Sequence, residues 1–408
     1  MRRVAVFNLG SIGNFGDEII ADTTVWLIRS LRPDFETEFV QLQPLARHYP
    51  ISLLPDYVFG RLCWTVVRRV LRHSPPSVRF PFDRLVWRMR NGRYFRSHLR
   101  GAAAAVYAMG MIKFRNQGFC HLAAMVNEEA TRLGIPVMLS AGSVAQVDPS
   151  DVRCRQLREA LHEPSVRAIS TRDGETGVER LRRDYGLDLP DLSAVGDPAL
   201  WIPECYGIRR DPSACGPVGV NLARHGLFAT YGSGADDASL VAFYGEFGRE
   251  LDRRGVDWVL FSNGMDQDER FGRDLLAAHG WPAEKLLPRS QDVRGFIRRV
   301  GSFKAVFGLR LHSCLTAWSL GVPVAGVDWE DKIRCVAASL GASAHFIPAR
   351  SLSATAAVDN LLRAMSEPID QMALSRLRTA TRTALGRFLE GVPGDASADG
   401  KLRRGGLE

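Results

Sequence analysis

The chain has 408 residues, 46% of them hydrophobic, and a formal net charge of +8. These values indicate a globular protein that is too long for a single hydrophobic core. Its seven cysteines show neither metal-type spacing nor an even disulfide framework, and no apolar run is long enough to span a bilayer. The apolar run near Met1 is broken at Asn8, so no signal peptide is expected. We therefore expect a two-domain cytoplasmic protein.

The chain opens with a short buried strand, residues 4–7, followed by a turn that contains Gly10, Gly13 and Gly16. Glycines at this density let a backbone turn tightly and approach a ligand closely. Asn14 lies in the turn, and Asp17 is suited to cap or begin the helix that follows. The spacing matches neither a P-loop nor the dinucleotide-binding fingerprint. The turn is therefore a candidate binding loop of another kind.

A second strand, residues 38–42, leads into an arginine-rich insert at 45–100. Arg61 to Arg100 contains eleven arginines, no lysine and one acid, which amounts to a net charge of about +10. Amphipathic segments in this insert, with aromatics beside cations, fit either ordinary surface helices or a peripheral contact of 57–100 with an anionic membrane. No recognition motif accompanies the charge, so no nucleic acid partner is expected.

Strands and helices then alternate in two series, which predicts two parallel sheets with helices on both faces. The first series has strands at 103–108, 136–140, 167–170 and 192–195, with helices at 118–133, 150–161 and 174–185. A hinge is expected at 203–217. The second series has strands at 218–222, 256–261, 304–307 and 323–327, with helices at 236–253, 267–278 and 291–300.

The expected architecture is therefore α/β, with two Rossmann-like domains that face a central cleft. We expect an N-terminal domain at 1–205, including the insert, and a C-terminal domain at 206–350. A helical stretch at 351–390 is expected to cross back over the first domain. The tail at 391–408 is polar and glycine-rich, which predicts disorder.

The stretch 305–327 is the strongest candidate for the chemistry. It is predicted to form a strand, a turn, a helix and a second strand, and Arg310 and His312 lie in the turn that opens the helix. A helix N-terminus, here at Ser313, favours an anionic ligand. The alternative is that Arg310 pairs with a nearby carboxylate and His312 only caps the helix.

Three further loops are expected to reach the same cleft. They carry Asn14 with Asp17, then Arg172, then Lys332. The structural alternatives are that Asp17 is only a helix cap, that Arg172 forms an ion pair within its own loop, and that Lys332 is a solvated lysine. Arginines, a lysine and a histidine without a metal cluster suit a small, highly charged anion.

The motifs at 10–19, 170–173, 196–200, 308–312 and 321–323, followed by Lys332, resemble in their order the polysaccharide pyruvyl transferase family. The resemblance covers most of the chain and departs from the family at 108–112 and in the arginine-rich insert. It implies a fold like that of GT-B glycosyltransferases, phosphoenolpyruvate as donor substrate without any other cofactor, and a sugar or lipid-linked glycan as acceptor. The family's arginine and histidine map onto Arg310 and His312.

In the mechanism that this resemblance suggests, Arg310 and Arg172 bind the carboxylate and phosphate of phosphoenolpyruvate. Lys332, Ser313 and Asn14 support the binding. His312 donates a proton to the donor, because its reference pKa of about 6.5 leaves both forms available near neutrality. Asp17 is the expected base. The alternatives are a GT-B glycosyltransferase that uses a nucleotide sugar and a non-catalytic, membrane-associated scaffold.

Overall fold

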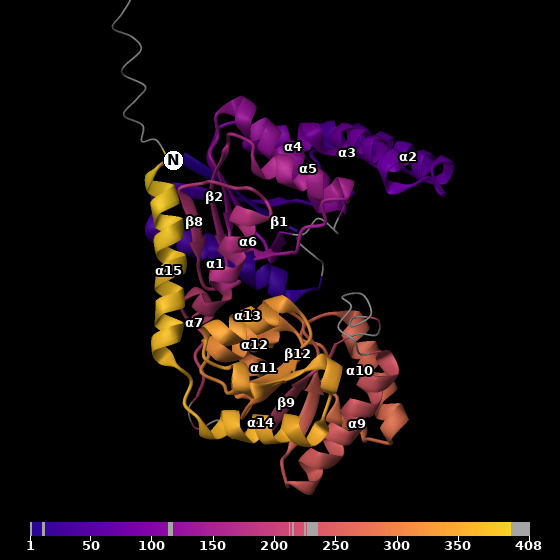
Figure 1. Cartoon of the computed structure of the whole chain (residues 1–408), viewed down its shortest axis with the longest axis vertical. Coiled ribbons are helices and arrows are strands. Elements are labelled where there is room, and N and C mark those ends of the chain that lie inside the picture. The colour runs from indigo at the N-terminus through magenta and orange to yellow at the C-terminus, as the bar shows by residue number, and fades with distance from the viewer. Residues whose placement is uncertain are drawn as a thin grey trace, which may run out of the picture.

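The computed structural model describes residues 2–9, 13–112, 117–211, 213, 216–223, 226 and 236–392. Two parallel sheets lie one above the other, each covered by helices (Figure 1). The first sheet belongs to the N-terminal half and the second to the C-terminal half. The fold is therefore α/β and parallel, as the alternation of strands and helices predicts.

The first sheet has the order β2-β1-β3-β5-β7-β8, and every neighbouring pair is parallel. The strands span Phe35–Gln41 (β2), Arg2–Asn8 (β1), Ala102–Ala108 (β3), Val137–Ser140 (β5), Val166–Thr171 (β7) and Asp191–Ala194 (β8). A small parallel pair, β4 (Met111–Ile112) and β6 (Ser143–Val144), extends beyond β3 and β5.

Alternate residues of β3 face two separate hydrophobic layers. Ala105 and Tyr107 join a core with helices α3 (Pro76–Leu99), α4 (Gln117–Leu133), α5 (Val152–Leu161) and α6 (Gly174–Arg183). Ala104 and Val106 join the opposite core. That face is covered by helices α1 (Phe15–Leu31) and α15 (Gln371–Glu390). Because successive side chains of a strand point to opposite faces of the sheet, each face has its own core and its own set of helices.

The second sheet has the order β10-β9-β11-β12-β13, again parallel throughout. Its strands span Trp258–Phe261 (β10), Val218–Asn221 (β9), Val306–Gly308 (β11), Val324–Asp328 (β12) and Phe346–Pro348 (β13). The helices of this half are α9 (Asp237–Arg253), α10 (Asp266–His279), α11 (Val293–Ser302), α12 (Leu311–Ser319), α13 (Asp331–Ser339) and α14 (Ala354–Ser366). The short helix α7 (Ile202–Tyr206) leads into it.

Two helices tie the halves together. The first turn of α1 packs into the core of the C-terminal half, where the Phe15 and Phe296 ring centroids are 5.4 Å apart. At the other end of the chain, α15 returns to the first sheet, whereas the first part of the stretch 351–390, helix α14, packs into the core of the C-terminal half. The Thr381 hydroxyl donates to the carbonyl of Gly196 at 2.8 Å, and Arg32 donates to the carbonyl of Leu389 at 2.9 Å.

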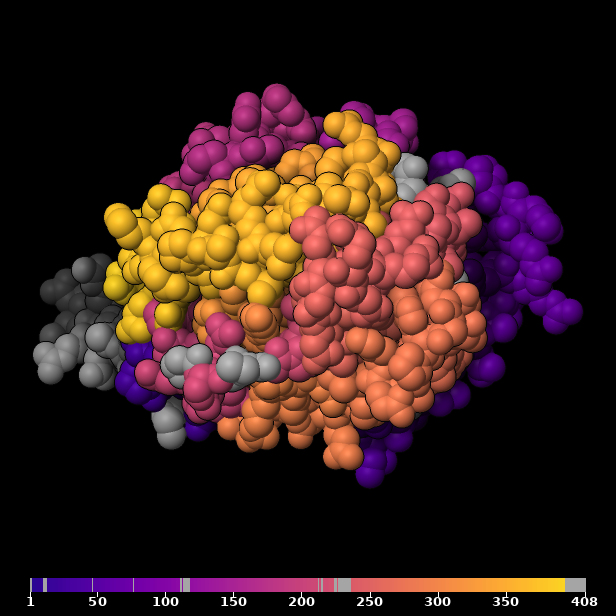
Figure 2. Space-filling model, turned by 90° about the horizontal axis from the view of Figure 1, so that it is seen from below, coloured from indigo at the N-terminus to yellow at the C-terminus, as the bar shows by residue number. Residues whose placement is uncertain are grey.

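The arginine-rich insert forms two helices, α2 (Leu54–Val70) and α3. We refer to residues 51–99 as the arm. Within the arm, α3 packs between α2 and α4, and α2 is the outermost helix (Figure 1). The arm projects from the edge of the molecule opposite α15, and a view from below shows the same separation (Figure 2).

Several elements differ from those expected. The pair β4 and β6, the helix α13 and the strand β13 were not predicted, because each is short and lacks a strong periodic signal. The expected hinge begins with α7, and residues 212, 214 and 215 lie outside the described residues. Only 391 and 392 of the expected disordered tail are described. Among the described residues, no helix is both long and apolar enough to cross a membrane.

Candidate functional site

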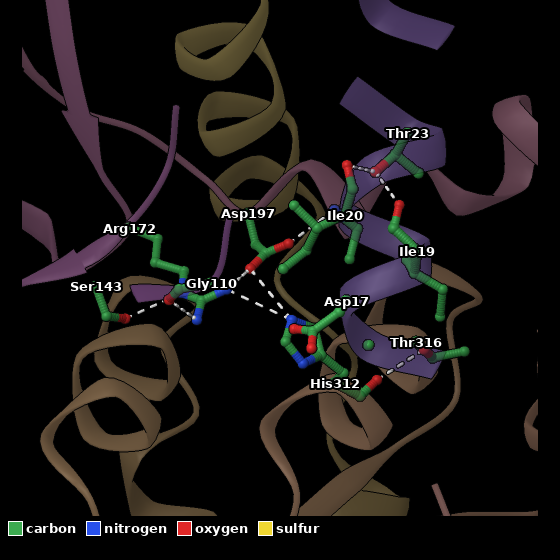
Figure 3. Close-up of polar contacts among 12 residues, drawn as sticks. Asp17, Ile19, Ile20, Thr23, Gly110, Ser143, Arg172, Asp197, His312 and Thr316 are labelled. Atoms are coloured by element: carbon green, nitrogen blue, oxygen red, sulfur yellow. Dashed lines mark hydrogen bonds and ion pairs between the residues drawn. The ribbon is translucent and has the colours of Figure 1, made fainter. Parts of the chain in front are cut away.

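The carboxyl ends of strands from both sheets meet beside the first turn of α1. Arg172 follows β7, Asp197 follows β8 and His312 follows β11. Their side chains converge in Figure 3, where Asp17 projects from α1 toward His312. Ligands of open α/β sheets bind at such strand ends. This junction is therefore the candidate site.

A buried ion pair between Arg172 and Asp197 occupies the centre of the site. Nη1 of Arg172 contacts Oδ2 of Asp197, and the two side chains are 2% and 0% exposed. Nε of Arg172 donates to the Ser143 hydroxyl at 3.0 Å, and Nη2 donates to the carbonyl of Gly110 at 2.6 Å. These contacts leave the guanidinium with a single well-defined orientation.

Both neutral partners of Arg172 are positioned by the small β4–β6 pair. Gly110 immediately precedes β4, and its carbonyl also accepts the N–H of Ser143, the first residue of β6, at 3.2 Å. The turn before β6 holds Ala141 at a φ of 52°, a conformation that costs an alanine about 1 kcal/mol. The local structure is thus arranged around the guanidinium.

The structure corrects the predicted environment of Arg172. An anion clamp or an ion pair within the loop was expected, but the partner is Asp197, and the side chain is almost inaccessible. Asp173 occupies the N-cap position of α6, but its side chain makes no capping hydrogen bond there. Its Oδ2 accepts the N–H of Val144 at 2.6 Å, and burial raises the pKa of its carboxyl. Both side chains therefore organise the loops from within.

His312, the second residue of α12, directs its imidazole at the ion pair. Nε2 lies 3.5 Å from Nη1 of Arg172 and 3.9 Å from Oδ2 of Asp197, and the side chain is 13% exposed. On the other side, a Cβ at Gly16 of α1 would lie 2.3 Å from Nδ1 of His312. Only glycine permits this contact, so the ring is held between the two halves.

The pKa of His312 falls from 6.5 to about 3, mainly because the ring is buried. Asp197 opposes this shift, while the positive charges of Arg172 and Lys332 add to it. A guanidinium can only donate, so the Nε2 that faces it acts as an acceptor. The lowered pKa of His312 therefore does not fit the expectation that both protonation states coexist near neutrality.

Arg310 forms a bidentate ion pair with the buried Asp268 of α10. Nε and Nη2 donate to the carboxylate at 3.1 and 2.5 Å, and the arginine side chain is 19% exposed. Its backbone N–H donates to Asn221 at 2.9 Å. Among the described residues, Nη1 of Arg310 donates no hydrogen bond. The carboxylate alternative considered from sequence is thus observed, and Nη1 still offers donors to a ligand.

Lys332 lies in the first turn of α13, where Nζ is 2.6 Å from Oε2 of Glu330 and the side chain is 20% exposed. Nζ also lies 5.6 Å from the ring centroid of Trp329. The indole N–H of Trp329 donates to the carbonyl of Leu309 at 2.6 Å, which fixes the loop after β12 against the end of β11. The lysine is therefore held at the site rather than freely solvated.

Asparagine side chains connect the two halves at the base of the site. Asn14 caps α1 by accepting the N–H of Gly16 at 3.3 Å, and its amide donates to Asp17 at 3.0 Å. Asn263, after β10, donates to Asn14 at 3.3 Å. Beside this contact, a Cβ at Gly264 would lie 2.6 Å from the carbonyl of Gly13. The helix cap is Asn14, and Asp17 follows in the first turn.

Ser313 does not present its side chain to a ligand. It is fully buried, its hydroxyl lies 3.5 Å from the Asn263 side chain, and its N–H donates to the carbonyl of Arg310 at 3.0 Å. This contradicts its predicted role in binding. Among the described residues, the N–H groups that remain unbonded at this helix N-terminus are those of Leu311 and His312.

Four side chains at the site were not predicted: Ser143, Asp197, Asn263 and Asp268. Asp197 had a detectable signal, because an aspartate followed by Pro198 after a strand is a typical helix start, and its other oxygen accepts the N–H of Ala199 at 2.8 Å. No sequence signal distinguished Asp268, because it belongs to an acidic first turn of the kind that begins many helices.

Known proteins provide an independent comparison with this geometry. The sequence profile of the polysaccharide pyruvyl transferase family matches residues 14–331. No curated protein matches the chain. Similar solved structures include UDP-GlcNAc 2-epimerase from Neisseria meningitidis bound to UDP-GlcNAc, with 11% identity, a TM-score of 0.55 and coverage of 96% of this chain and 100% of that one.

Two other similar structures are a putative UDP-N-acetylglucosamine 2-epimerase from Listeria monocytogenes (12% identity, TM-score 0.54, coverage 95% and 94%) and S. aureus MnaA with UDP (10% identity, TM-score 0.53, coverage 95% and 95%). At these identities the likeness shows the fold alone, which is GT-B-like. The family profile covers strands of both sheets, all but β1 and β13, and includes every candidate residue except Lys332, which follows its last matched position. The chain therefore belongs to the polysaccharide pyruvyl transferase family.

Proposed function

We propose that this enzyme transfers a pyruvyl group from phosphoenolpyruvate to hydroxyls of a sugar or glycan precursor and releases phosphate. The observation that carries the proposal is the position of the His312 imidazole, which lies beside the Arg172 guanidinium in the first turn of α12. Such a site attracts a small polyanion and can then protonate it. Family membership supports a pyruvyl transfer, and the donor is our inference from the chemistry of these side chains.

The donor carries a phosphate and a carboxylate, so it requires two cationic contacts. Lys332 and Nη1 of Arg310 supply them, because the side chains of Lys332 and Arg310 are partly exposed while that of Arg172 is buried. The unbonded N–H groups of Leu311 and His312 complete the anion site. We assign Arg172 a positioning role instead, in which it holds Asp197 and orients the imidazole.

The donor also changes the acidity of His312. Negative charge beside the ring opposes the effect of Arg172 and Lys332, so the pKa of His312 rises when the donor binds. The protonated ring then delivers its proton to the methylene carbon of the donor. The adjacent carbon becomes electrophilic and is attacked by an acceptor hydroxyl, whose proton passes to a base, for which Asp17 remains our candidate.

The atoms balance over the whole reaction. The first hydroxyl adds to the central carbon of the donor, and the second displaces phosphate from that carbon, which closes a ketal. One hydroxyl proton replaces the proton that His312 gave to the new methyl group, and the other leaves with phosphate. No oxidant or reductant is consumed.

Phosphoenolpyruvate should raise the melting temperature of the protein, whereas UDP should not. At a ligand concentration of 100 times the dissociation constant, stabilisation is about 2.7 kcal/mol, or roughly 3 °C for a chain of this length. Thermal-shift measurements with each ligand check this. Mass spectrometry of acceptor sugars incubated with phosphoenolpyruvate should then detect pyruvylated product and released phosphate. Stabilisation by UDP alone would instead indicate a nucleotide-sugar glycosyltransferase.

Replacing His312 by Asn should lower turnover by about 10²-fold or more while leaving donor affinity within roughly threefold. The asparagine fills similar space but cannot donate a proton to carbon. Phosphate release and donor binding are measured separately. His162→Asn, at an exposed position in α5's C-cap, serves as the matched control. Turnover near that of the control would remove His312 from the chemistry.

Gly16→Ala should reduce turnover on the order of 10²-fold, because the new methyl group would force the imidazole out of position. The matched control is Gly386→Ala in α15, where the nearest atom to a new Cβ is 3.7 Å away. Both variants are compared for turnover and for melting temperature. Equal activity of the two folded variants would contradict the proposed placement of the ring.

The protein should lose stability on acidification through His312. Its folded-state pKa of about 3 lies below the value of 6.5, so the unfolded chain takes up the proton first. The free energy of unfolding is therefore highest above pH 6.5 and decreases as the pH falls toward 3. Between pH 7.5 and pH 5 the decrease due to His312 is about 2 kcal/mol.

Urea denaturation of the wild type and of His312→Asn at these two pH values isolates the effect. The buried His121, whose pKa is lowered to about 4, is present in both proteins and cancels in the comparison. The free energy of unfolding should therefore fall by about 2 kcal/mol less in the variant. An identical loss in both proteins would mean that the imidazole is protonated normally.

A further inference from the structure

The outer helix of the arm exposes a continuous apolar ridge. Val58, Leu62, Val66 and Val70 recur at every fourth position of α2, which places them along one side of the helix. Each is between 54% and 73% exposed, and Ile51 just before the helix is 87% exposed. Of all the residues of α2, Gly60 alone is buried. No part of the described chain covers this ridge.

Helix α3 adds a second exposed apolar row. Val78, Phe82, Leu85 and Met89 follow one another at intervals of three or four residues, and each is more than a third exposed. The opposite side of α3 packs against α4, where Phe80 contacts the His121 ring at a centroid distance of 4.4 Å. The arm thus has an inner side that packs against the protein and an apolar outer side that no described residue covers.

The arginines of the arm fall into two groups that sequence alone does not separate. On α3, Arg84 and Arg88 pair with Glu128 of α4, and Arg96 pairs with Glu129. These cations fasten the arm to the body. A considerable part of the positive charge counted in the sequence is therefore neutralised within the fold.

The second group lies at the outer end of the arm. Arg61, Arg68, Arg69 and Arg72 are exposed, and none forms an ion pair with an acidic residue of the described chain. The two acids of the arm have other partners: Asp56 lies 3.5 Å from Arg93, and Asp83 lies 3.5 Å from Arg79. The apolar ridge of α2 is therefore flanked by positive charge that no local carboxylate balances.

We propose that the arm binds the surface of a bilayer that contains anionic lipids. An apolar helix face beside arginines matches the boundary between acyl chains and negatively charged headgroups, where the apolar residues insert and the arginines contact phosphate. An electrically neutral partner would account for the ridge but not for the uncompensated arginines. This contact is distinct from the proposed transfer reaction and does not depend on it.

Vesicle flotation with the full chain tests the proposal. The protein should float with vesicles of phosphatidylcholine and phosphatidylglycerol at 3:1, and at least roughly tenfold less with phosphatidylcholine alone. Raising NaCl from 0.1 to 0.5 M should weaken the binding, because salt screens the arginines. Equal binding to both vesicles, or no binding to either, would overturn the proposal.

Charge-reversal variants locate the contact. Arg68→Glu with Arg69→Glu should reduce binding to the anionic vesicles by roughly tenfold or more. The matched control is Arg376→Glu with Arg382→Glu, which makes the same change of charge at exposed positions of α15 on the opposite edge. If the control loses as much binding, net charge rather than the arm is responsible, and the proposal fails.

Polar substitutions test the ridge in the same way. Leu62→Asn with Val66→Asn should weaken flotation severalfold, while Met372→Asn, at an exposed position of α15, should not. Size-exclusion chromatography of the same proteins identifies the competing explanation. A dimer that the Leu62 and Val66 substitutions dissociate, together with no vesicle binding by the wild type, would show that a second copy of the chain covers the arm.

Discussion

The buried ion pair between Arg172 and Asp197 is the interaction on which the site depends. Neither charge is accessible to water, so removing one partner would leave the other uncompensated at a cost of about 3–5 kcal/mol. The pair joins the ends of β7 and β8 to the β4–β6 strands, and His312 approaches it from the other sheet. The imidazole therefore faces a rigid surface, and burial against that surface lowers the pKa of the ring.

The first turn of α1 fixes the distance between the halves. Asn14 contacts Asn263, Gly13 approaches Gly264, and Gly16 supports the ring of His312. The close contacts at positions 13 and 16 require glycine, and the contact at position 14 requires a short amide side chain. This explains why the glycine-rich turn does not match a phosphate-binding motif: its glycines at 13 and 16 allow contact with the other half of the protein and need not contact a nucleotide. Gly10 lies outside the described residues.

Sequence periodicity predicted most of the fold, because long buried strands and amphipathic helices carry strong local signals. It also predicted that Arg172, Arg310 and His312 lie near one another, because residues that follow parallel strands lie at the same edge of a sheet. It could not predict their partners. Asp197 lies 25 positions from Arg172, and Asp268 lies 42 positions from Arg310. Such pairs depend on tertiary packing, which also buries Ser313 and lowers the pKa of His312.

The same limit applies to charge. A count of arginines describes the arm as uniformly basic. In the described part of the chain, by contrast, Arg84, Arg88 and Arg96 of α3 pair with glutamates of α4, whereas Arg61, Arg68 and Arg69 of α2 form no ion pair. In the site, the Arg172 guanidinium is likewise buried against Asp197, and burial lowers the pKa of His312. If the donor is a polyanion, its binding and the protonation of His312 are thermodynamically linked, so each favours the other. The acid then forms only when there is a donor to protonate.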